Sequence, residues 1–193
     1  MPWEKQFDRD EVLDKAMKVF WSRGFEATSM QTLVERTGIN RGSLYATYGD
    51  KRALFLASLR MYDDRMRRKR LAALEASASP RAAVRRLLQA FAEIGSDRAE
   101  NYGCFLTNTA LELAAHDPEA GAIVAGAQTE IEAFFARMIR KGQQEGDISA
   151  GVRPKETARA LLAALIGLAV LSRSRPERGL LNGIVEEAVG RLG

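Results

Sequence analysis

A short stretch between Asn40 and Lys51 gathers side chains suited to contact a polar, grooved partner. It reads NRGSLYATYGDK and combines an arginine, hydroxyl residues, two tyrosines and a lysine. A guanidinium can donate to two acceptors on a guanine edge, and hydroxyl and ammonium groups donate to phosphate oxygens. Small residues between them would let a helix approach the floor of a major groove about 12 Å wide. These residue types therefore favour recognition of double-stranded DNA.

The sequence lacks the spacings on which catalytic sites depend. It has one histidine and contains no G-x-S-x-G, H-E-x-x-H or P-loop pattern, and its acidic residues are scattered at helix-surface spacing. We therefore expect no enzymatic activity, no metal site and no cofactor.

The sequence also suggests a cytoplasmic location. The single cysteine, Cys104, excludes an internal disulfide and fits a reducing compartment. The first residues lack the basic and then apolar run of a signal peptide. The longest apolar stretch, at 160–171, is about a third too short to span a bilayer. We expect no membrane partner.

Two short helices must position the polar stretch. The segment TSMQTLVERTG predicts the first, with Thr28 and Gln31 at capping-box spacing and Gly38 at its end. Gly38 allows the left-handed backbone of a tight turn, and Asn40 caps the second helix. Apolar residues would pack both helices against a preceding one, which runs from Asp8 or Asp10 to Gly24. These are Leu33, Val34, Ile39 and Leu44. The pattern predicts a helix-turn-helix at about 28–48.

Helical periodicity continues along the rest of the chain. Asp50 caps a long helix that ends at the Ser/Ala/Pro break at 77–80, and further amphipathic segments follow at 81–96, 102–116, 118–145, 154–173 and 177–192. The sequence therefore predicts an all-α fold of about nine helices. We expect a three-helix DNA-binding domain at 1–50, a connecting helix at 51–78 and a larger effector-binding and dimerisation domain at 79–193.

The charge is distributed unevenly between these parts. Residues 1–70 contain 15 Lys and Arg against 10 Asp and Glu, whereas residues 71–193 contain 14 against 15. The basic excess therefore lies in the first third and indicates an anionic partner for that part alone, with nucleic acid favoured over a membrane surface.

The first third resembles the N-terminal domain of TetR-type bacterial transcriptional regulators. The match covers roughly 10–55 and rests on Gly24-Phe25, Thr28, the Gly38 turn, Ser43-Leu44-Tyr45, Tyr48 and Lys51. The remaining two-thirds are similar only in length, helical character and charge. The resemblance implies a homodimer that binds a palindromic operator and is released by a small-molecule effector.

The resemblance also implies roles by position. Arg41 and Gly42, at the start of the recognition helix, would face base edges, and Tyr45 and Thr47 would contact bases or phosphate. The phosphate candidates are Thr28, Ser29, Ser43, Tyr48 and Lys51, with Lys5 and Arg9 as possible additions. The alternatives are that the tyrosines are core aromatics and that Arg41 is a solvated surface charge. We assign the basic run at 65–70 to a solvated helix face, because the family directs that part away from DNA.

Aromatic, thiol and amide groups near 102–108 could line a mostly apolar pocket with a few polar anchors. The candidates are Phe91, Tyr102, Cys104, Phe105, Asn108, Phe134 and Met138. Plain core packing is the alternative for each aromatic residue. Cys104 would lie near a helix N-terminus, where a thiol is more reactive. Some members of the family sense electrophiles through a cysteine in this region, and simple packing is the alternative.

The last two helices carry apolar residues at three- and four-residue steps and predict a four-helix dimer interface. The candidates are Leu161, Leu165, Leu168, Leu171, Leu181, Ile184, Val185 and Val189, and Gly167 would permit close approach. Burial within one subunit is the alternative.

The sequence predicts a ligand-controlled dimeric repressor. Two further hypotheses stay open: an electrophile- or redox-sensing repressor acting through Cys104, and an architectural DNA-binding protein without ligand control. Under each of these three hypotheses, we expect the protein not to be an enzyme.

Overall fold

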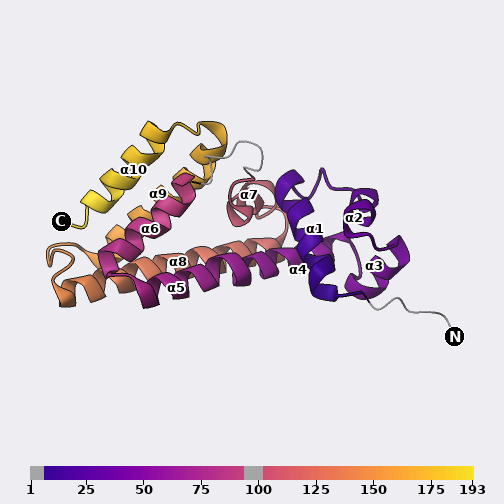
Figure 1. Cartoon of the computed structure of the whole chain (residues 1–193), viewed down its shortest axis with the longest axis horizontal. Helices are drawn as coiled ribbons and strands as arrows, with labels where there is room; N and C mark the ends of the chain where they lie inside the picture. Colours follow the sequence, from indigo (N-terminus) through magenta and orange to yellow (C-terminus); the bar gives the residue numbers. More distant parts are fainter. Residues whose placement is uncertain (1–6, 94–101) are drawn as a thin grey trace.

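The structure, a computed structural model, describes residues 7–93 and 102–193. Within these ranges the chain contains no strand. It forms nine helices there, when three consecutive segments of one long rod are counted together. The all-α prediction is confirmed. The N-terminal helices lie at one end of an elongated molecule, and the last two helices lie towards the other (Figure 1).

The first three helices form a small unit, here called the head. They are α1 (Arg9–Arg23), α2 (Met30–Thr37) and α3 (Arg41–Tyr48). Gly24 ends α1 at φ 85°, and Gly38 turns the chain between α2 and α3 at φ 74°, a left-handed conformation that glycine adopts without a steric penalty. The predicted turn between the helices is therefore present.

Aromatic residues join the head to the helix that follows it. The ring of Phe55 lies edge-on to Phe20 and to Phe25, with centroid separations of 5.2 and 5.1 Å. Leu33 and Leu44 from α2 and α3 are fully buried in the same core. The head is therefore held by apolar burial and edge-to-face aromatic contacts, each worth about 0.5–1.5 kcal/mol beyond area burial.

A continuous rod runs from the head along the length of the molecule. It comprises α4 (Lys51–Tyr62), the π-helical turn η1 (Asp63–Arg68) and α5 (Lys69–Ser77). Asp50 caps its start by accepting a hydrogen bond from the Ala53 amide at 2.7 Å. The long helix predicted between Asp50 and the break at 77–80 is present. The sequence periodicity did not predict the π-helical turn in its middle.

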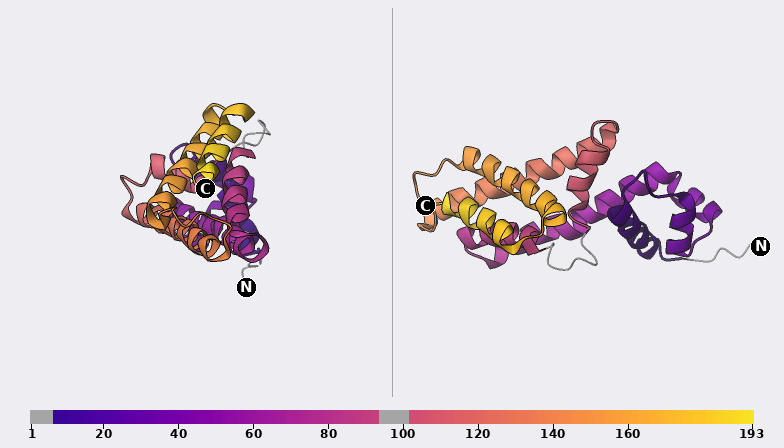
Figure 2. Two further views of the ribbon diagram at one scale, coloured as in Figure 1. Left: turned by 90° about the vertical axis from the view of Figure 1, so that its left-hand side faces the viewer. Right: turned by 90° about the horizontal axis from the view of Figure 1, so that it is seen from above.

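The remaining helices form the body. They are α6 (Pro80–Glu93), α7 (Phe105–Glu112), α8 (Pro118–Glu145), α9 (Pro154–Ser174) and α10 (Arg178–Gly190). The long helix α8 lies beside the rod, α6 and α9 pack over these two, and α10 packs on α6 and α9 (Figures 1 and 2). The short α7 lies between the body and the head (Figure 1). The helix predicted at 102–116 is therefore shorter than expected, because Cys104 precedes its first turn and Leu113 ends it.

Among the described residues, one helix, α9, is long and apolar enough to cross a membrane, by length and composition alone. The shorter apolar stretch at 160–171, on which the sequence-based expectation rested, is too short to do so. The 18-residue window of α9 has a mean hydropathy of 1.4, and only 33% of that window is buried within the chain. This criterion is weak evidence, because core helices of soluble proteins also meet it. Part of its apolar surface packs against α6, α8 and α10.

Candidate nucleic-acid interface and internal cavity

The helix α3 presents a polar face to solvent at its N-terminal end. Asn40 caps it by accepting a hydrogen bond from the Ser43 amide at 2.9 Å, and Leu44 anchors it in the core. Arg41, Gly42 and Tyr45 are exposed. A cap followed by one buried leucine thus fixes which side of this two-turn helix remains available to a partner.

Arg41 and Tyr45 form a pair on this exposed face. The guanidinium carbon lies 5.6 Å from the centre of the tyrosine ring, and Nη2 lies 3.4 Å from the hydroxyl oxygen. Among the residues that the structure describes, Arg41 has no carboxylate partner. The guanidinium is therefore free to donate to an external acceptor. Because stacking on the tyrosine ring already restricts the side chain, it loses less conformational entropy on binding.

Other predicted DNA contacts surround this pair. Ser43 and Thr47 are partly buried on α3, whereas Ser29 is exposed and caps α2 by accepting from the Thr32 amide at 3.0 Å. The Lys51 ammonium lies 4.2 Å from the centre of the Phe25 ring, at the N-terminus of α4. Hydroxyls and a cation near helix N-termini are the groups that phosphate contacts use. The roles of these residues stay predictions.

The structure corrects the predicted role of Thr28. This residue is fully buried, and its hydroxyl donates to the Gly24 carbonyl at 2.6 Å. The capping residue of α2 is the next one, Ser29, so the capping-box interpretation of Thr28 and Gln31 is wrong by one position. The side chain of Thr28 tightens the loop after α1 and is not available to phosphate.

Tyr48 also differs from the prediction. Its hydroxyl donates to the Arg9 carbonyl at 2.9 Å and so ties the end of α3 to the start of α1. Burial raises the pKa of this phenol, so it stays protonated. The proton that a phosphate contact would need is already donated within the head. Lys5 lies outside the described residues.

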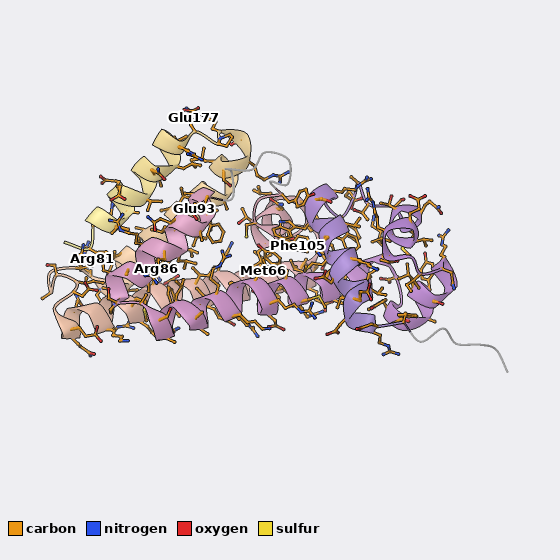
Figure 3. The ribbon with its side chains drawn as sticks, in the orientation of Figure 1. Met66, Arg81, Arg86, Glu93, Phe105 and Glu177 are labelled. Atoms are coloured by element: carbon orange, nitrogen blue, oxygen red, sulfur yellow. The ribbon has the colours of Figure 1, made fainter. Side chains whose placement is uncertain are left out.

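Polar contacts from α7 hold the head against the body. The Trp21 indole donates to the Gly103 carbonyl at 3.0 Å, just before α7. At the other end of α7, the two carboxylate oxygens of Glu112 accept from the amides of Phe25 and Glu26 at 3.1 and 2.9 Å. Phe105, the first residue of α7 and labelled in Figure 3, packs edge-on against Phe55 and Tyr62 of α4, with centroid separations of 5.5 and 5.6 Å. The helix α7 therefore contacts the head at both of its ends.

Ion pairs between the rod and α8 reinforce this attachment. Arg52 donates to both oxygens of Asp117, at 2.6 and 2.8 Å. This hydrogen bonding holds the pKa of Asp117 at about 2, below its ordinary value of 3.8. Glu119 accepts from both Arg52 and Arg60. Two basic residues near the start of the rod are therefore bound to the start of α8 rather than offered to DNA.

A cavity of about 180 Å³ lies between the rod, α6, α7, α8 and α9, with one residue of α1 in its wall. Of the predicted lining residues, Phe91, Tyr102 and Cys104 contribute to this wall. The others do not, and they are Phe105, Asn108, Phe134 and Met138. Phe105, Phe134 and Met138 are core residues exposed by at most 1%, and Asn108 bonds to the Tyr102 carbonyl and to Arg173. These four assignments are corrected.

Sequence reasoning missed most of the polar residues in the wall. These are Arg67, Arg70, Thr107 and Gln128, with the aromatic residues Trp21 and Tyr62 beside them. Arg67 belongs to the basic run at 65–70, which was assigned to a solvated face. It is buried, although its five neighbours in that run are exposed. The only signal in the sequence was Asp63 four residues earlier, a spacing that is also common on exposed helix surfaces.

The predicted dimer residues lie mostly inside the chain. Those exposed by at most 2% are Leu161, Leu165, Leu168, Leu181, Val185 and Val189. They pack within one subunit, and Leu165 also reaches the cavity wall. Only Leu171 and Ile184 are partly exposed. The leucine stripe is therefore core, because the body needs it to join α9 and α10 to α6 and α8.

The outer surface of α9 and α10 instead carries small residues. A groove there is lined by residues that include Ala160, Ala163, Ala164, Gly179, Gly183 and Ile184. A Cβ atom built at Gly167, Gly179 or Gly183 would meet nothing within 4 Å in the described part of the chain beyond the adjoining backbone of its own helix. Glycine within a helix costs about 1 kcal/mol relative to alanine, and contacts within this chain do not explain that cost.

Comparison with known families gives two matches that together span most of the chain. Residues 12–58 match the family described as bacterial regulatory proteins, tetR family. Residues 80–183 match the tetracyclin repressor-like C-terminal domain.

Individual proteins are similar over comparable lengths. The chain is 33% identical over 145 residues to the uncharacterized HTH-type transcriptional regulator YezE of Bacillus subtilis, covering 75% of each. It is 32% identical over 170 residues to the HTH-type transcriptional repressor ComR of Escherichia coli, covering 88% of this chain and 81% of that protein. A solved structure of a cysteine mutant of the regulator CifR, complexed with 26-bp double-strand operator DNA, superposes with a TM-score of 0.82 at 31% identity and covers 98% of both chains.

Proposed function

The chain belongs to the tetR family of bacterial regulatory proteins and is a DNA-binding transcriptional regulator, and we propose that it is a cytoplasmic homodimeric repressor. It would bind a palindromic operator through α3 and release it when a small molecule occupies the cavity. The observation that carries the proposal is the exposed guanidinium of Arg41 at the first position of a capped helix, which has no carboxylate partner among the described residues.

The contacts that we propose follow from the geometry of α3. Arg41 would read a guanine edge, with Gly42 allowing close approach and Tyr45 and Thr47 beside it. The phosphate contacts would come from Ser29, Ser43 and Lys51. The similarity to CifR, which was solved with operator DNA, supports placing α3 in a major groove. Thr28 and Tyr48 act instead by shaping the head.

The small-residue groove of α9 and α10 supports the dimer. Two thirds of the apolar window of α9 are not buried within the chain, and a second copy would cover that surface about a two-fold axis. We propose that Gly167, Gly179 and Gly183 let the two pairs of helices approach closely. Two-fold symmetry would place two α3 helices on the half-sites of a palindrome.

The contacts of α7 support a route from the cavity to DNA. Trp21 belongs to the head and also lines the cavity, while Gly103 lines the same wall and accepts the indole N–H. A molecule that fits better when α1 has moved would favour states in which the two heads no longer match the operator spacing. The ligand must bind the two states differently, because equal affinity shifts nothing.

A second candidate is a repressor that senses electrophiles or oxidants through Cys104. The thiol lies in the cavity wall directly before α7 and accepts a hydrogen bond from the Tyr62 hydroxyl at 3.8 Å. A modified sulfur would disturb both the cavity and the position of the Trp21 side chain, which donates to the neighbouring Gly103 carbonyl. A Cys104→Ser variant that is still released from its operator by electrophiles would exclude this candidate.

The test begins with selection of bound sequences from random DNA by the purified chain, followed by sedimentation of the complex and a screen for metabolites that release it. We expect a palindromic consensus, two chains per site and release by at least one small molecule. Binding without sequence preference, unaffected by any metabolite, would support an architectural protein instead. A single chain per site would contradict the proposed dimer.

A further inference from the structure

Among the described residues, the wall of the cavity contains positive charge and no acid. Two of its residues, Arg67 and Arg70, are arginines, and no aspartate or glutamate of the described ranges lines it. The remainder is mainly apolar and aromatic, with Thr107 and Gln128 as neutral polar groups. Small-molecule sites commonly have this composition: apolar walls and a few polar groups that orient the ligand.

Arg67 is buried and incompletely bonded. Its side chain is 7% exposed. Nε and Nη2 donate to the Asp63 carboxylate, and Nη2 also donates to Glu130 at 2.8 Å. Nη1 is the one buried side-chain nitrogen or oxygen of the described residues that has no hydrogen-bond partner. A buried donor left unpaired is destabilising, so an acceptor at this atom would be strongly favoured.

Arg67 lines the cavity, and Asp63 and Glu130 already accept from its other guanidinium nitrogens, so Nη1 is the donor left for a ligand there. Nη1 is itself buried, so a ligand in the cavity reaches it only by displacing a neighbouring side chain. The residue lies in η1, where the π-helical turn shifts the side-chain register of the rod. Single π-helical turns are rare and occur often at functional sites.

The charge of Arg67 is compensated by Asp63 and Glu130, so Arg70 is the source of uncompensated positive charge in the wall. It is exposed, and it has no ion pair or hydrogen bond to the other described residues. Met66, which also lines the cavity, lies on the rod between α6 and α7 (Figure 3). A ligand held in this cavity would therefore meet one neutralised guanidinium with a free donor and one uncompensated guanidinium.

We propose that the effector is a small organic carboxylate with a compact apolar or aromatic body. One carboxylate oxygen accepts from Nη1 of Arg67, and Arg70 balances the charge. The body packs among Trp21, Phe91 and Leu162, all in the wall. A cavity of about 180 Å³ suits a single-ring body, since a dry cavity of about 150 Å³ binds benzene. This inference rests on the proposed function, in which the cavity is the effector site.

The test compares benzoate, benzamide and toluene as probes on the full purified chain, by calorimetry and by tryptophan fluorescence. A Trp3→Phe background leaves Trp21, in the cavity wall, as the only tryptophan. We expect benzoate to bind at least about tenfold more tightly than the other two, because hydrogen bonds to charged groups are worth about 1.5–3 kcal/mol. Equal binding of the three probes, tighter binding of toluene, or no binding of benzoate up to roughly 10 mM, a limit at which only about 3 kcal/mol of binding is needed, would overturn the proposal.

Variants locate the preference. Arg70→Gln, at an exposed position, should remove most of the advantage of benzoate, and Arg67→Lys should do the same while keeping a cation beside Asp63. Lys69→Gln, an exposed neighbour outside the wall, is the matched control and should change nothing. A preference that survives in both cavity variants would overturn the proposal. If Arg67→Lys does not fold, Arg70→Gln and the probe series in the natural chain still decide.

Operator binding is measured separately on the same preparation. A chain that binds a palindrome but shows no carboxylate preference would overturn this inference and leave the proposed function intact. A chain that prefers benzoate but binds no operator would sustain the carboxylate site and contradict the repressor.

Discussion

Two arginines are placed in opposite ways in this molecule. Arg41 extends from a capped two-turn helix into solvent and contacts a tyrosine one turn further along. Arg67 is buried against Asp63 and Glu130 in the wall of a cavity. Each has donors left over, but the first can change its partner at little cost and the second cannot. The head thus offers charge to a large external surface, whereas the cavity wall holds charge in a fixed position for a small molecule.

The two arginines should differ most in how much their substitution lowers the free energy of unfolding. Arg67→Ala leaves the carboxylate of Asp63, which is 8% exposed, with only the more distant Nε of Arg68, at 3.4 Å, as a cation and should cost up to about 3–5 kcal/mol of unfolding free energy. Arg41→Ala should change it by less than about 0.5 kcal/mol. Urea denaturation measures both. Equal losses in the two variants would contradict the contrast.

For operator binding, substitution of Arg41 should have a larger effect than substitution of Arg67. Arg41→Ala should lose about 1–3 kcal/mol of discrimination between operator and random DNA, because a bidentate contact to guanine is lost. Lys51→Ala should weaken binding to every sequence alike and flatten the salt dependence by about one unit. Quantitative binding at several salt concentrations measures both. A uniform loss in the Arg41 variant would make that residue a phosphate contact, and Arg153→Ala, at the start of α9, serves as control.

The contact between the two regions is tested at Glu112. Glu112→Gln replaces one acceptor oxygen with an NH2 group, which cannot accept a hydrogen bond, so either the Phe25 or the Glu26 amide loses its partner. We expect a loss of about 1–3 kcal/mol in stability and a weaker effect of any cavity ligand on operator binding. Thermal unfolding and operator release report the two. Glu145→Gln, at the end of α8, is the matched control. Unchanged release in the Glu112 variant would exclude α7 as the connection.

The smallest effect should come from pH. Because Arg52 lowers the folded-state pKa of Asp117 to about 2, the ion pair contributes fully above the ordinary value of 3.8 and is lost as the pH falls towards 2. The pair is exposed to solvent, which screens it, so we expect only a small loss of stability. Asp117→Asn should remove this part of the acid dependence while keeping an oxygen to cap α8. An identical slope between pH 4 and pH 2 in both proteins would contradict the assignment.

Local patterns were sufficient where one residue decides one backbone conformation. Gly38, Asn40 and Asp50 each control a turn or a helix start through their own geometry, and the head follows from them. The same reasoning was wrong by one residue at Thr28, because two adjacent hydroxyl residues can each cap a helix. Which of them is buried depends on the loop after α1.

Patterns of apolar residues were less informative in the body. Leu161 and Leu165 lie on an apolar stripe that would suit a dimer interface and a subunit core equally well, and only the packing of α6 and α8 assigns them to the core. Phe134 and Met138 likewise belong to the core, although aromatic and sulfur-containing residues also line ligand sites.

The sequence by itself determined the helical class, the position of the helix-turn-helix and the exposed arginine at its start, because these depend on residues within one or two turns of each other. The tertiary structure decided where the cavity lies, which residues of the basic run face it, and which surface of α9 and α10 stays open. Those features join residues from distant helices, such as Trp21 with Gly103 and Arg67 with Glu130. No local spacing encodes such a meeting, since it depends on how whole helices pack.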